Sequence, residues 1–248
     1  MPLDRVLARA LALVRRSARS AAELGLPQQC ELCSARSRNT LVCDACSRTL
    51  PRAACACRVC ALPVVAADVC GRCLAGPPAF ERTVAAFTYA YPVDHLLHAF
   101  KYRGRLALAH WCASELRHAI ASAAIDTTGL RIVAMPLVPE RQRERGFNQA
   151  QEIARLVAAN LDAELAQGLV RRVKGAVPQT ALAWSERAAN VRGAFRCGQD
   201  PRGLDIAVVD DVMTTGASLH ELARTLKAAG ARSVQNWVIA RTLPPLAV

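Results

Sequence analysis

Two adjacent carboxylates, Asp210 and Asp211, stand between an apolar run at 206–209 and a turn rich in threonine and glycine. An uninterrupted apolar run is typical of a strand buried on both faces. Carboxylates at its end can accept hydrogen bonds from two vicinal hydroxyls. Hydroxyls and backbone N–H groups where the next helix begins can hold a phosphate dianion; here they would come from Thr214, Thr215, Gly216, Ala217 and Ser218. The order of these groups predicts a site for a phosphorylated pentose. Neither the aspartate pair nor the Thr-Thr-Gly turn alone would indicate such a site, because in many α/β proteins such acids only cap a helix or face solvent.

Several segments carry a family resemblance. IAVVDDVMTTGAS at 206–218 resembles the phosphoribosyl pyrophosphate motif of type I phosphoribosyltransferases. Shorter segments resemble the ComF (ComFC) branch and keep its order: FKYRG at 100–104, MPL at 135–137, RQRERGFNQA at 141–150, PQT at 178–180, and parts of 186–195. The resemblance implies an α/β fold of the type I phosphoribosyltransferase kind. A mostly parallel sheet would be covered by helices and preceded by a small cysteine-rich zinc-ribbon module.

The resemblance also implies ligand contacts. Asp210 and Asp211 would bind the ribose 2′- and 3′-hydroxyls of Mg²⁺-phosphoribosyl pyrophosphate. The oxygens of this substrate would supply most of the ligands of the Mg²⁺ ion. The turn at 214–218 would bind the 5′-phosphate. Pro136 and Leu137 would lie in the pyrophosphate-binding turn, although residue types alone favour a proline that ends a strand. On the nucleophile side, the implied contacts are Gln179, Arg187 and Asn190.

A basic segment precedes the glycine at 146. A loop with such a hinge can close over a pyrophosphate leaving group and neutralise the charge that grows on it. We therefore place Arg145 with the two aspartates as catalytic candidates, and Asn148 and Arg141 as ligand contacts. The alternative is a solvated charged face. Thr214 stands where purine-salvage relatives have a carboxylate base. Because a hydroxyl is a poor base at neutral pH, purine salvage is disfavoured.

Nine of the eleven cysteines lie between positions 30 and 73, and eight of them repeat one spacing, C-x2-C-x9-C-x2-C. Two such pairs complete a tetrahedral sulfur site, so we predict two structural zinc ions, with ligands grouped sequentially. The ligands are Cys30, Cys33, Cys43 and Cys46, then Cys57, Cys60, Cys70 and Cys73. Interleaved grouping would use the same eight. A disulfide framework is disfavoured because no secretory signal is evident.

The elements that must position these groups alternate along the chain. We expect strands at 84–89, 132–135, 206–209 and 234–240, and helices at 93–102, 106–123, 149–160 and 219–229. Such alternation predicts a parallel sheet with ligands at the carboxyl ends of its strands. The expected domains are an amphipathic helix at 1–28, a module with two four-cysteine zinc sites at 29–80 and a phosphoribosyltransferase-like domain at 81–248. The amphipathic helix could pack on the body or lie at a membrane surface.

The balance of 32 Lys and Arg against 20 Asp and Glu gives a net charge of +12 and favours acidic partners. A generally basic proteome would produce the same excess. Candidate contacts for single-stranded DNA are Lys101, Arg103, Arg171, Arg172 and Lys174, with aromatic rings nearby at 102, 147 and 184.

Two functions stay open at this point. One is a factor that binds phosphoribosyl pyrophosphate or a nucleotide and handles single-stranded DNA with the uptake machinery during natural transformation, as the resemblance implies. The alternative is an active phosphoribosyltransferase of unknown acceptor without a DNA role. No run approaches the roughly 20 apolar residues of a membrane span. We therefore expect a cytoplasmic protein, with peripheral contact at the inner membrane as the alternative.

Overall fold

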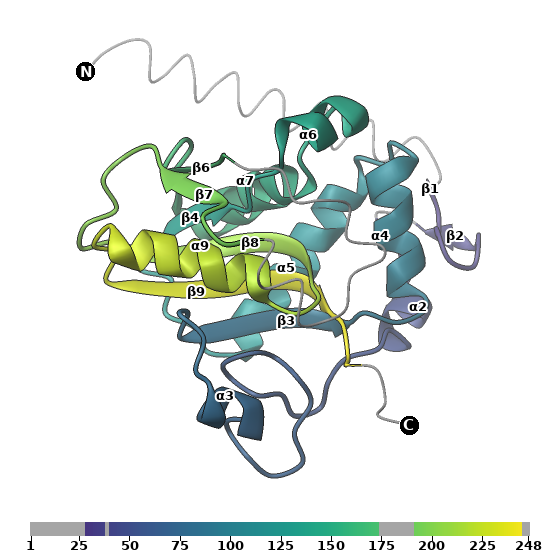
Figure 1. Cartoon of the computed structure of the whole chain (residues 1–248). Coiled ribbons are helices and arrows are strands. Elements are labelled where there is room, and N and C mark those ends of the chain that lie inside the picture. The colour runs from purple at the N-terminus through teal and green to yellow at the C-terminus, as the bar shows by residue number, and fades with distance from the viewer. Residues whose placement is uncertain (1–27, 38–39, 174–190, 245–248) are drawn as a thin grey trace, which may run out of the picture. The chain divides into compact units, whose positions relative to one another are not determined.

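The computed structural model describes residues 28–37, 40–173 and 191–244 (Figure 1). The expected helix at 1–28 lies almost wholly outside these residues, and so do Lys174, Gln179, Arg187 and Asn190. The chain forms two compact units, of which the first ends at Thr49 and the second begins at Leu50. This division falls within the expected 29–80 module, and the domain boundaries given above stay predictions. None of the described helices is long and apolar enough to cross a bilayer.

The first unit is small and is built around one cysteine cluster. Strand β1 (Gln28–Gln29) pairs antiparallel with β2 (Arg36–Ser37), and helix α2 (Asp44–Arg48) follows. Among its described residues 28–37 and 40–49 there are few large apolar side chains, so a metal or another cross-link would stabilise this part of the chain.

The second unit contains a sheet with strand order β3–β9–β8–β4–β5, in which every neighbouring pair is parallel. The strands are β3 (Arg82–Thr88), β4 (Arg131–Ala134), β5 (Glu164–Leu165), β8 (Asp205–Met213) and β9 (Ser233–Arg241). The expected parallel sheet is therefore confirmed. Strands β6 (Val170–Arg172) and β7 (Phe195–Cys197) form a separate antiparallel sheet of two strands.

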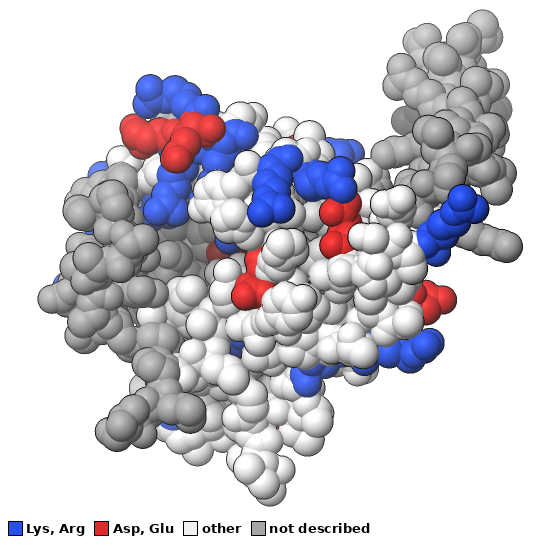
Figure 2. Space-filling view, turned by 90° about the vertical axis from the view of Figure 1, so that its right-hand side faces the viewer, with Lys and Arg blue, Asp and Glu red and all other residues white. Residues whose placement is uncertain are grey.

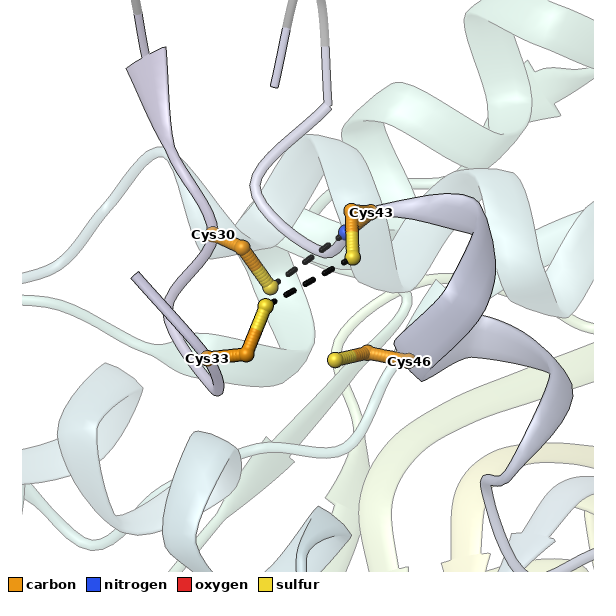
Figure 3. Close-up of side chains that lie close together, drawn as sticks. All are labelled: Cys30, Cys33, Cys43 and Cys46. Carbon is orange, nitrogen blue, oxygen red and sulfur yellow. Dashed lines mark hydrogen bonds between the residues drawn. The ribbon is translucent and has the colours of Figure 1, made fainter. Parts of the chain in front are cut away.

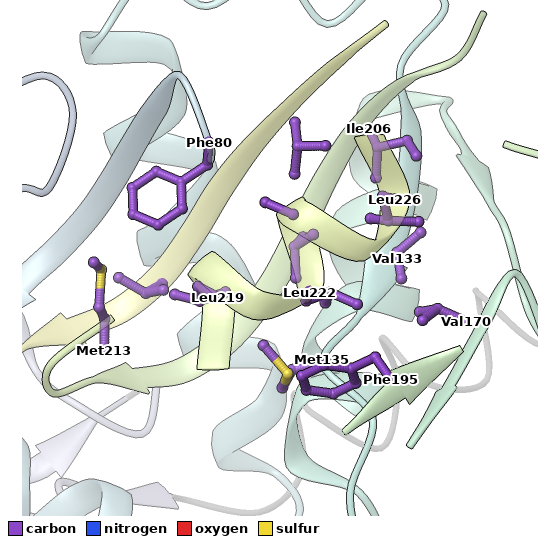
Figure 4. Close-up of a cluster of buried hydrophobic side chains, with 14 of the residues drawn as sticks. Phe80, Val133, Met135, Val170, Phe195, Ile206, Met213, Leu219, Leu222 and Leu226 are labelled. Atoms are coloured by element: carbon purple, nitrogen blue, oxygen red, sulfur yellow. The ribbon is translucent and has the colours of Figure 1, made fainter. Parts of the chain in front are cut away.

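Helices cover both faces of this sheet, as parallel strands require. In Figure 1, α9 (Ala217–Ala228) lies in front of the sheet, and α5 (Leu108–Ser122) and α7 (Gln149–Leu161) lie behind it. Figure 4 shows Leu222 and Leu226 of α9 beside Ile206 and Val133 in one buried cluster. Helix α4 (Val93–Tyr102) has the bounds expected from its periodicity, and α3 (Gly71–Ala75) is a short helix beside the second cysteine cluster.

Two elements differ from expectation. Strand β8 continues four residues beyond the predicted end, so both aspartates lie inside the strand, where Asp210 pairs with Val238 of β9. The basic segment expected as a loop forms helix α6 (Pro139–Arg145), which ends at Gly146 in the left-handed region with φ of 75°. Proline at the first helical position and the Glu, Arg and Gln that follow favour a helix here.

Candidate functional site

The first cysteine cluster has the geometry of a tetrahedral metal site. The Sγ atoms of Cys30, Cys33, Cys43 and Cys46 all lie within 4.8 Å of one another and point toward a common centre (Figure 3). The Sγ atoms of Cys33 and Cys43 are 3.8 Å apart. Two sulfurs that each lie about 2.3 Å from one zinc ion at the tetrahedral angle are about 3.8 Å apart. The donor set therefore fits zinc.

The second cluster repeats this arrangement inside the larger unit. Cys57, Cys60, Cys70 and Cys73 again converge within 4.8 Å, and the Sγ atoms of Cys60 and Cys70 are 3.6 Å apart. The backbone N–H of Cys70 donates to the Sγ of Cys57 at 3.2 Å, as that of Cys43 does to Cys30 at 3.4 Å. The sequential grouping of ligands is confirmed. Because sulfur fills all four positions, each site is structural.

The first thiol of each cluster has a lowered pKa, which favours metal binding. Burial opposes ionisation of Cys30 and Cys57, but the backbone N–H groups that point at these sulfurs outweigh it. They lower the pKa of Cys30 to about 6 and that of Cys57 to about 7. A thiolate is the form that binds zinc, so the two sites hold one ready ligand each at neutral pH.

The paired aspartates lie half-buried at the carboxyl end of β8. The N–H of Asp211 donates to Oδ1 of Asp210 at 2.8 Å, and the N–H of Val212 donates to Oδ1 of Asp211 at 2.7 Å. Burial and the neighbouring charge of Asp211 raise the pKa of Asp210 well above its ordinary value. The pair therefore resists carrying two negative charges, and a ligand that donates hydrogen bonds or brings a cation would relieve it.

Lys101, in the last turn of α4, supplies one compensating charge. Its Nζ lies 2.7 Å from Oδ2 of Asp211, and the two side chains are only 18% and 14% exposed. Burial would raise the pKa of Asp211, but the ion pair with Lys101 outweighs it and lowers this pKa. Sequence reasoning placed Lys101 among the DNA contacts and missed this pairing across 110 positions. Its role toward DNA stays a prediction.

Arg145 lies close to the same carboxylate pair. Its Nη2 donates to the hydroxyl of Tyr102 at 3.0 Å, its Nη1 donates to Oε1 of Gln149 at 3.1 Å, and the guanidinium stacks over the Tyr102 ring. Its charge also lowers the pKa of Asp211. Gln149 was not predicted as a site residue. It is almost fully buried, and its Nε2 has no hydrogen-bond partner among the described residues.

The segment after β4 lies beside the acids. Ala134 pairs with Val209 of β8, and the N–H of Met135 donates to the Val209 carbonyl at 2.8 Å. The predicted pyrophosphate turn, Pro136 and Leu137, therefore follows β4 at the same edge of the sheet as the carboxylates. Both residues are half-buried.

Asn148 has a local structural role in this structure. Its Oδ1 accepts hydrogen bonds from the N–H groups of Ala150 and Gln151, which caps α7, and its Nδ2 donates to the Met135 carbonyl at 3.1 Å. This hydrogen bond joins the start of α7 to the segment after β4. The ligand contacts predicted for Asn148 and for exposed Arg141 stay predictions.

The turn after β8 is shaped by Gly216, which precedes α9 with φ of 82°. A Cβ at this position would lie 2.6 Å from Cε of Met213, which is the end of a flexible side chain and can move, so it is the left-handed backbone conformation that favours glycine here. Oγ1 of Thr215 accepts a hydrogen bond from the N–H of Ala217 at 3.1 Å. A small cavity of about 50 Å³ runs from Asp210 along the turn, lined by Asp210, Val212, Met213, Thr214, Thr215, Gly216, Ala217, Ser218 and Leu219.

The remaining predicted basic residues are spread over the surface. Arg103 and Arg171 are exposed, whereas Arg172 is half-buried, with its guanidinium over the Phe195 ring. Burial and the charge of Arg141 lower the pKa of Arg172. On the face in Figure 2, Lys and Arg lie interspersed with Asp and Glu and form no continuous basic field among the coloured residues.

Comparison with known proteins gives the following similarities. The family model "Double zinc ribbon domain" matches residues 21–74. DNA utilization protein YhgH of Escherichia coli (strain K12) is 35% identical over 211 residues, covering 82% of this chain and 91% of that protein. Competence protein F of Haemophilus influenzae is 31% identical over 182 residues, covering 71% and 79%. A crystal structure of a hypoxanthine phosphoribosyltransferase from Staphylococcus aureus aligns weakly, with a TM-score of 0.33 and 10% identity over 57% of this chain and 74% of that one.

We predict two zinc ions per chain by elemental analysis of protein purified under reducing conditions. Cys33→Ser and Cys60→Ser should each retain one ion, because each cluster has its own four sulfurs. Cys55→Ser should retain both, since Cys55 is exposed and belongs to neither cluster. Loss of both ions from either ligand variant would contradict two independent sites.

Asp210→Asn should raise the free energy of unfolding at neutral pH by about 1 kcal/mol, because the amide keeps the Oδ1 acceptor and removes a buried charge beside Asp211. The raised pKa means that the folded state holds this proton more tightly than the unfolded state. The contribution of Asp210 to stability is therefore greatest below its unfolded pKa and is lost as the pH rises through the folded pKa.

The advantage of Asn over Asp should accordingly grow with pH in urea unfolding measured between pH 5 and pH 8 with zinc present. Asp162→Asn is a matched control, because Asp162 is exposed and its left-handed conformation suits asparagine. A destabilised Asp210→Asn protein at pH 7 would show that the Asp210 charge is already compensated.

Proposed function

Because the chain belongs to the ComF family, whose relatives include proteins named for competence and for DNA utilization, we propose that it binds Mg²⁺-phosphoribosyl pyrophosphate or a related nucleotide and handles single-stranded DNA during uptake. The observation that carries the first part is half-buried Asp210, with Asp211 beside it, lining a cavity that continues along the turn at Gly216. In this arrangement Asp210 and Asp211 accept the ribose hydroxyls, and the N–H groups at the start of α9 receive the 5′-phosphate.

Lys101 gives this site its electrostatic balance. Without ligand, its ammonium compensates Asp211, and the high pKa of Asp210 limits the charge of the pair. When the two ribose hydroxyls donate to Asp210 and Asp211, they stabilise the ionised forms of both carboxylates. The hydrogen bonds between sugar and protein are then charge-assisted.

Magnesium fits this donor set as a companion of the ligand. Carboxylate oxygens are suitable for Mg²⁺, but Oδ2 of Asp211 is engaged by Lys101. Phosphate oxygens of the ligand would therefore supply most of the Mg²⁺ coordination. Asp210, which is outside the ion pair with Lys101, is the carboxylate of the pair that could add a ligand. The metal would neutralise charge on the pyrophosphate.

The cations around the acid pair suit the pyrophosphate side of the ligand. Arg145 stands at the end of α6 and shares its hydrogen bonds with Tyr102 and Gln149. A short rearrangement would bring its guanidinium to a leaving group, where bidentate hydrogen bonding stabilises growing negative charge. This arrangement also supports the second candidate function, pentosyl transfer to an unknown acceptor without a DNA role. Release of pyrophosphate in the absence of DNA would favour it.

Exposed Arg103 and Arg171 are the described residues best suited to contact a DNA strand, together with the exposed ring of Tyr102. The net charge of +12 supports binding to a polyanion. Single-strand binding combines basic side chains along the backbone with rings that stack on bases. The mixed charges in Figure 2 favour a narrow track of contacts over a broad basic field.

Isothermal titration of zinc-loaded protein with Mg²⁺-phosphoribosyl pyrophosphate should give saturable binding. Asp210→Asn and Asp211→Asn should each weaken it by roughly 10- to 100-fold, because each removes a charge-assisted hydrogen bond to a ribose hydroxyl. Asp162→Asn, which changes an exposed acid outside the site, should bind like the wild type. A wild-type protein that ignores this ligand, or variants that bind it equally well, would contradict the proposed sugar-phosphate site.

For DNA, the affinity for a single-stranded oligonucleotide should fall with rising salt, and Arg103→Gln/Arg171→Gln should flatten this dependence. Each lost phosphate contact removes about 0.7 from the slope of log K against log salt. Arg155→Gln serves as the control, because Arg155 lies in an exposed ion pair with Glu152 on α7. An affinity that is independent of salt in the wild type would argue against a basic DNA surface.

A further inference from the structure

Arg241, the last residue of β9, joins two parts of the second unit that are far apart in sequence. The residue is buried, with 2% of its surface exposed. Its Nε donates to the carbonyl of Cys60 at 2.7 Å. Its Nη1 donates to the carbonyls of Met213 at 2.9 Å, of Thr242 at 2.8 Å, and of Thr214. One rigid guanidinium thus bridges a zinc-ligand segment and the start of the ribose-phosphate turn.

The position of the Cys60 carbonyl depends on the metal site. Cys60 is one of the four ligands of the second cluster, and the backbone around it is a tight turn. The N–H of Ala61 donates to the Cys57 carbonyl at 2.8 Å, and Ala61 takes a left-handed φ of 56°. A zinc ion that fixes the Cys57 and Cys60 sulfurs also fixes this turn, and with it the carbonyl that Arg241 contacts.

Side-chain packing between the cluster and the turn is incomplete. Phe80 and Met213 share an apolar cluster with Cys60. Beside them, however, lies an open cavity of about 480 Å³, whose lining includes Cys60, Cys73, Phe80, Thr215, Gly216 and Arg241. The hydrogen bonds of Arg241 connect the Cys60 carbonyl directly to the start of the turn, while a second polar contact at this cavity, from the N–H of Ala79 to Nδ1 of His220 at 3.0 Å, joins the segment after the cluster to α9.

The turn is also sensitive to the residue that Arg241 holds. The space at Gly216 is limited by the side chain of Met213, whose carbonyl accepts from Arg241 and from the N–H of Thr242 at 3.0 Å. Because Met213 ends β8 only three residues before Gly216, a shift of the Met213 backbone would be carried along the chain into the turn before α9. This links the guanidinium to the backbone N–H groups that would receive a phosphate.

We propose that Arg241 is a positioning residue through which the second four-cysteine site, and not the first, sets the geometry of the turn at 214–218. Loss of zinc from the second site would release the Cys60 carbonyl and loosen the Arg241 bridge. It would also lower the affinity of the turn for phosphate, and this effect rests on the proposed function. Every carbonyl that Arg241 contacts lies in the second unit, so the first site should have no such effect.

Hydrogen–deuterium exchange of the full zinc-loaded chain tests this directly. Amides of residues 217–220, where the N–H groups of Ala217 and His220 donate within the turn and the first turn of α9, should exchange roughly tenfold faster in Arg241→Met and in Cys60→Ser, because loss of the Arg241 hydrogen bonds loosens the backbone that carries these amides. Cys33→Ser is the matched control and should exchange like the wild type. Arg241→Lys keeps the charge but lacks the planar fork, so it should resemble Arg241→Met. Titration with Mg²⁺-phosphoribosyl pyrophosphate on the same samples should show a parallel loss of affinity.

Peptides from α7 report whether the body stays folded. The proposal is overturned by unchanged exchange at the turn in Arg241→Met or Cys60→Ser, by equal effects of Cys33→Ser and Cys60→Ser, or by wild-type behaviour of Arg241→Lys. Loss of protection throughout α7 would also overturn it, since Arg241 would then hold the whole fold. If the turn loosens as expected but the wild type binds no Mg²⁺-phosphoribosyl pyrophosphate, the proposed function fails and the positioning role stands.

Discussion

Two neighbouring carboxylates in a half-buried position cannot both be ionised without nearby compensation, and this constraint organises the site. Lys101 compensates Asp211, while burial and the neighbouring charge hold the pKa of Asp210 high. A fold that only needed to be stable would place an uncharged residue there. The electrostatic cost is understandable if a ligand with two hydroxyls and a phosphate completes the arrangement. In the proposed function, the adjacent turn, with Gly216 in a left-handed conformation, would receive the phosphate.

The parallel sheet brings these groups together from distant parts of the sequence. Because parallel strands end at one edge, the acids of β8 and the segment after β4 become neighbours. Lys101 reaches the same edge from α4. The second cysteine cluster belongs to this body as well, since Cys60 and Phe80 share a buried cluster with residues of β8 and α9. The second metal site, expected only to stabilise a small module, thus belongs to the same packed body as the turn at 214–218.

Local patterns in the sequence predicted most of what is local in the structure. Cysteine spacing was sufficient for both metal sites, because each ligand set lies within 17 consecutive residues. Periodicity was sufficient for the bounds of α4. The length of β8 was missed because pairing with β9 extends it through Asp210 and Asp211, which interrupt the apolar run. The Lys101–Asp211 pair and the Arg241 bridge were missed because they depend on tertiary placement across long sequence separations.

The central claim is that the acid pair and the turn after it grip a phosphorylated pentose. A crystal structure of the zinc-loaded protein grown with Mg²⁺-phosphoribosyl pyrophosphate tests this claim most directly. The ribose 2′- and 3′-hydroxyls should lie within hydrogen-bonding distance of Asp210 and Asp211, with the 5′-phosphate against the N–H groups of residues 215–218. Density for the ligand elsewhere, or an acid pair unchanged beside an empty turn at saturating ligand, would contradict it.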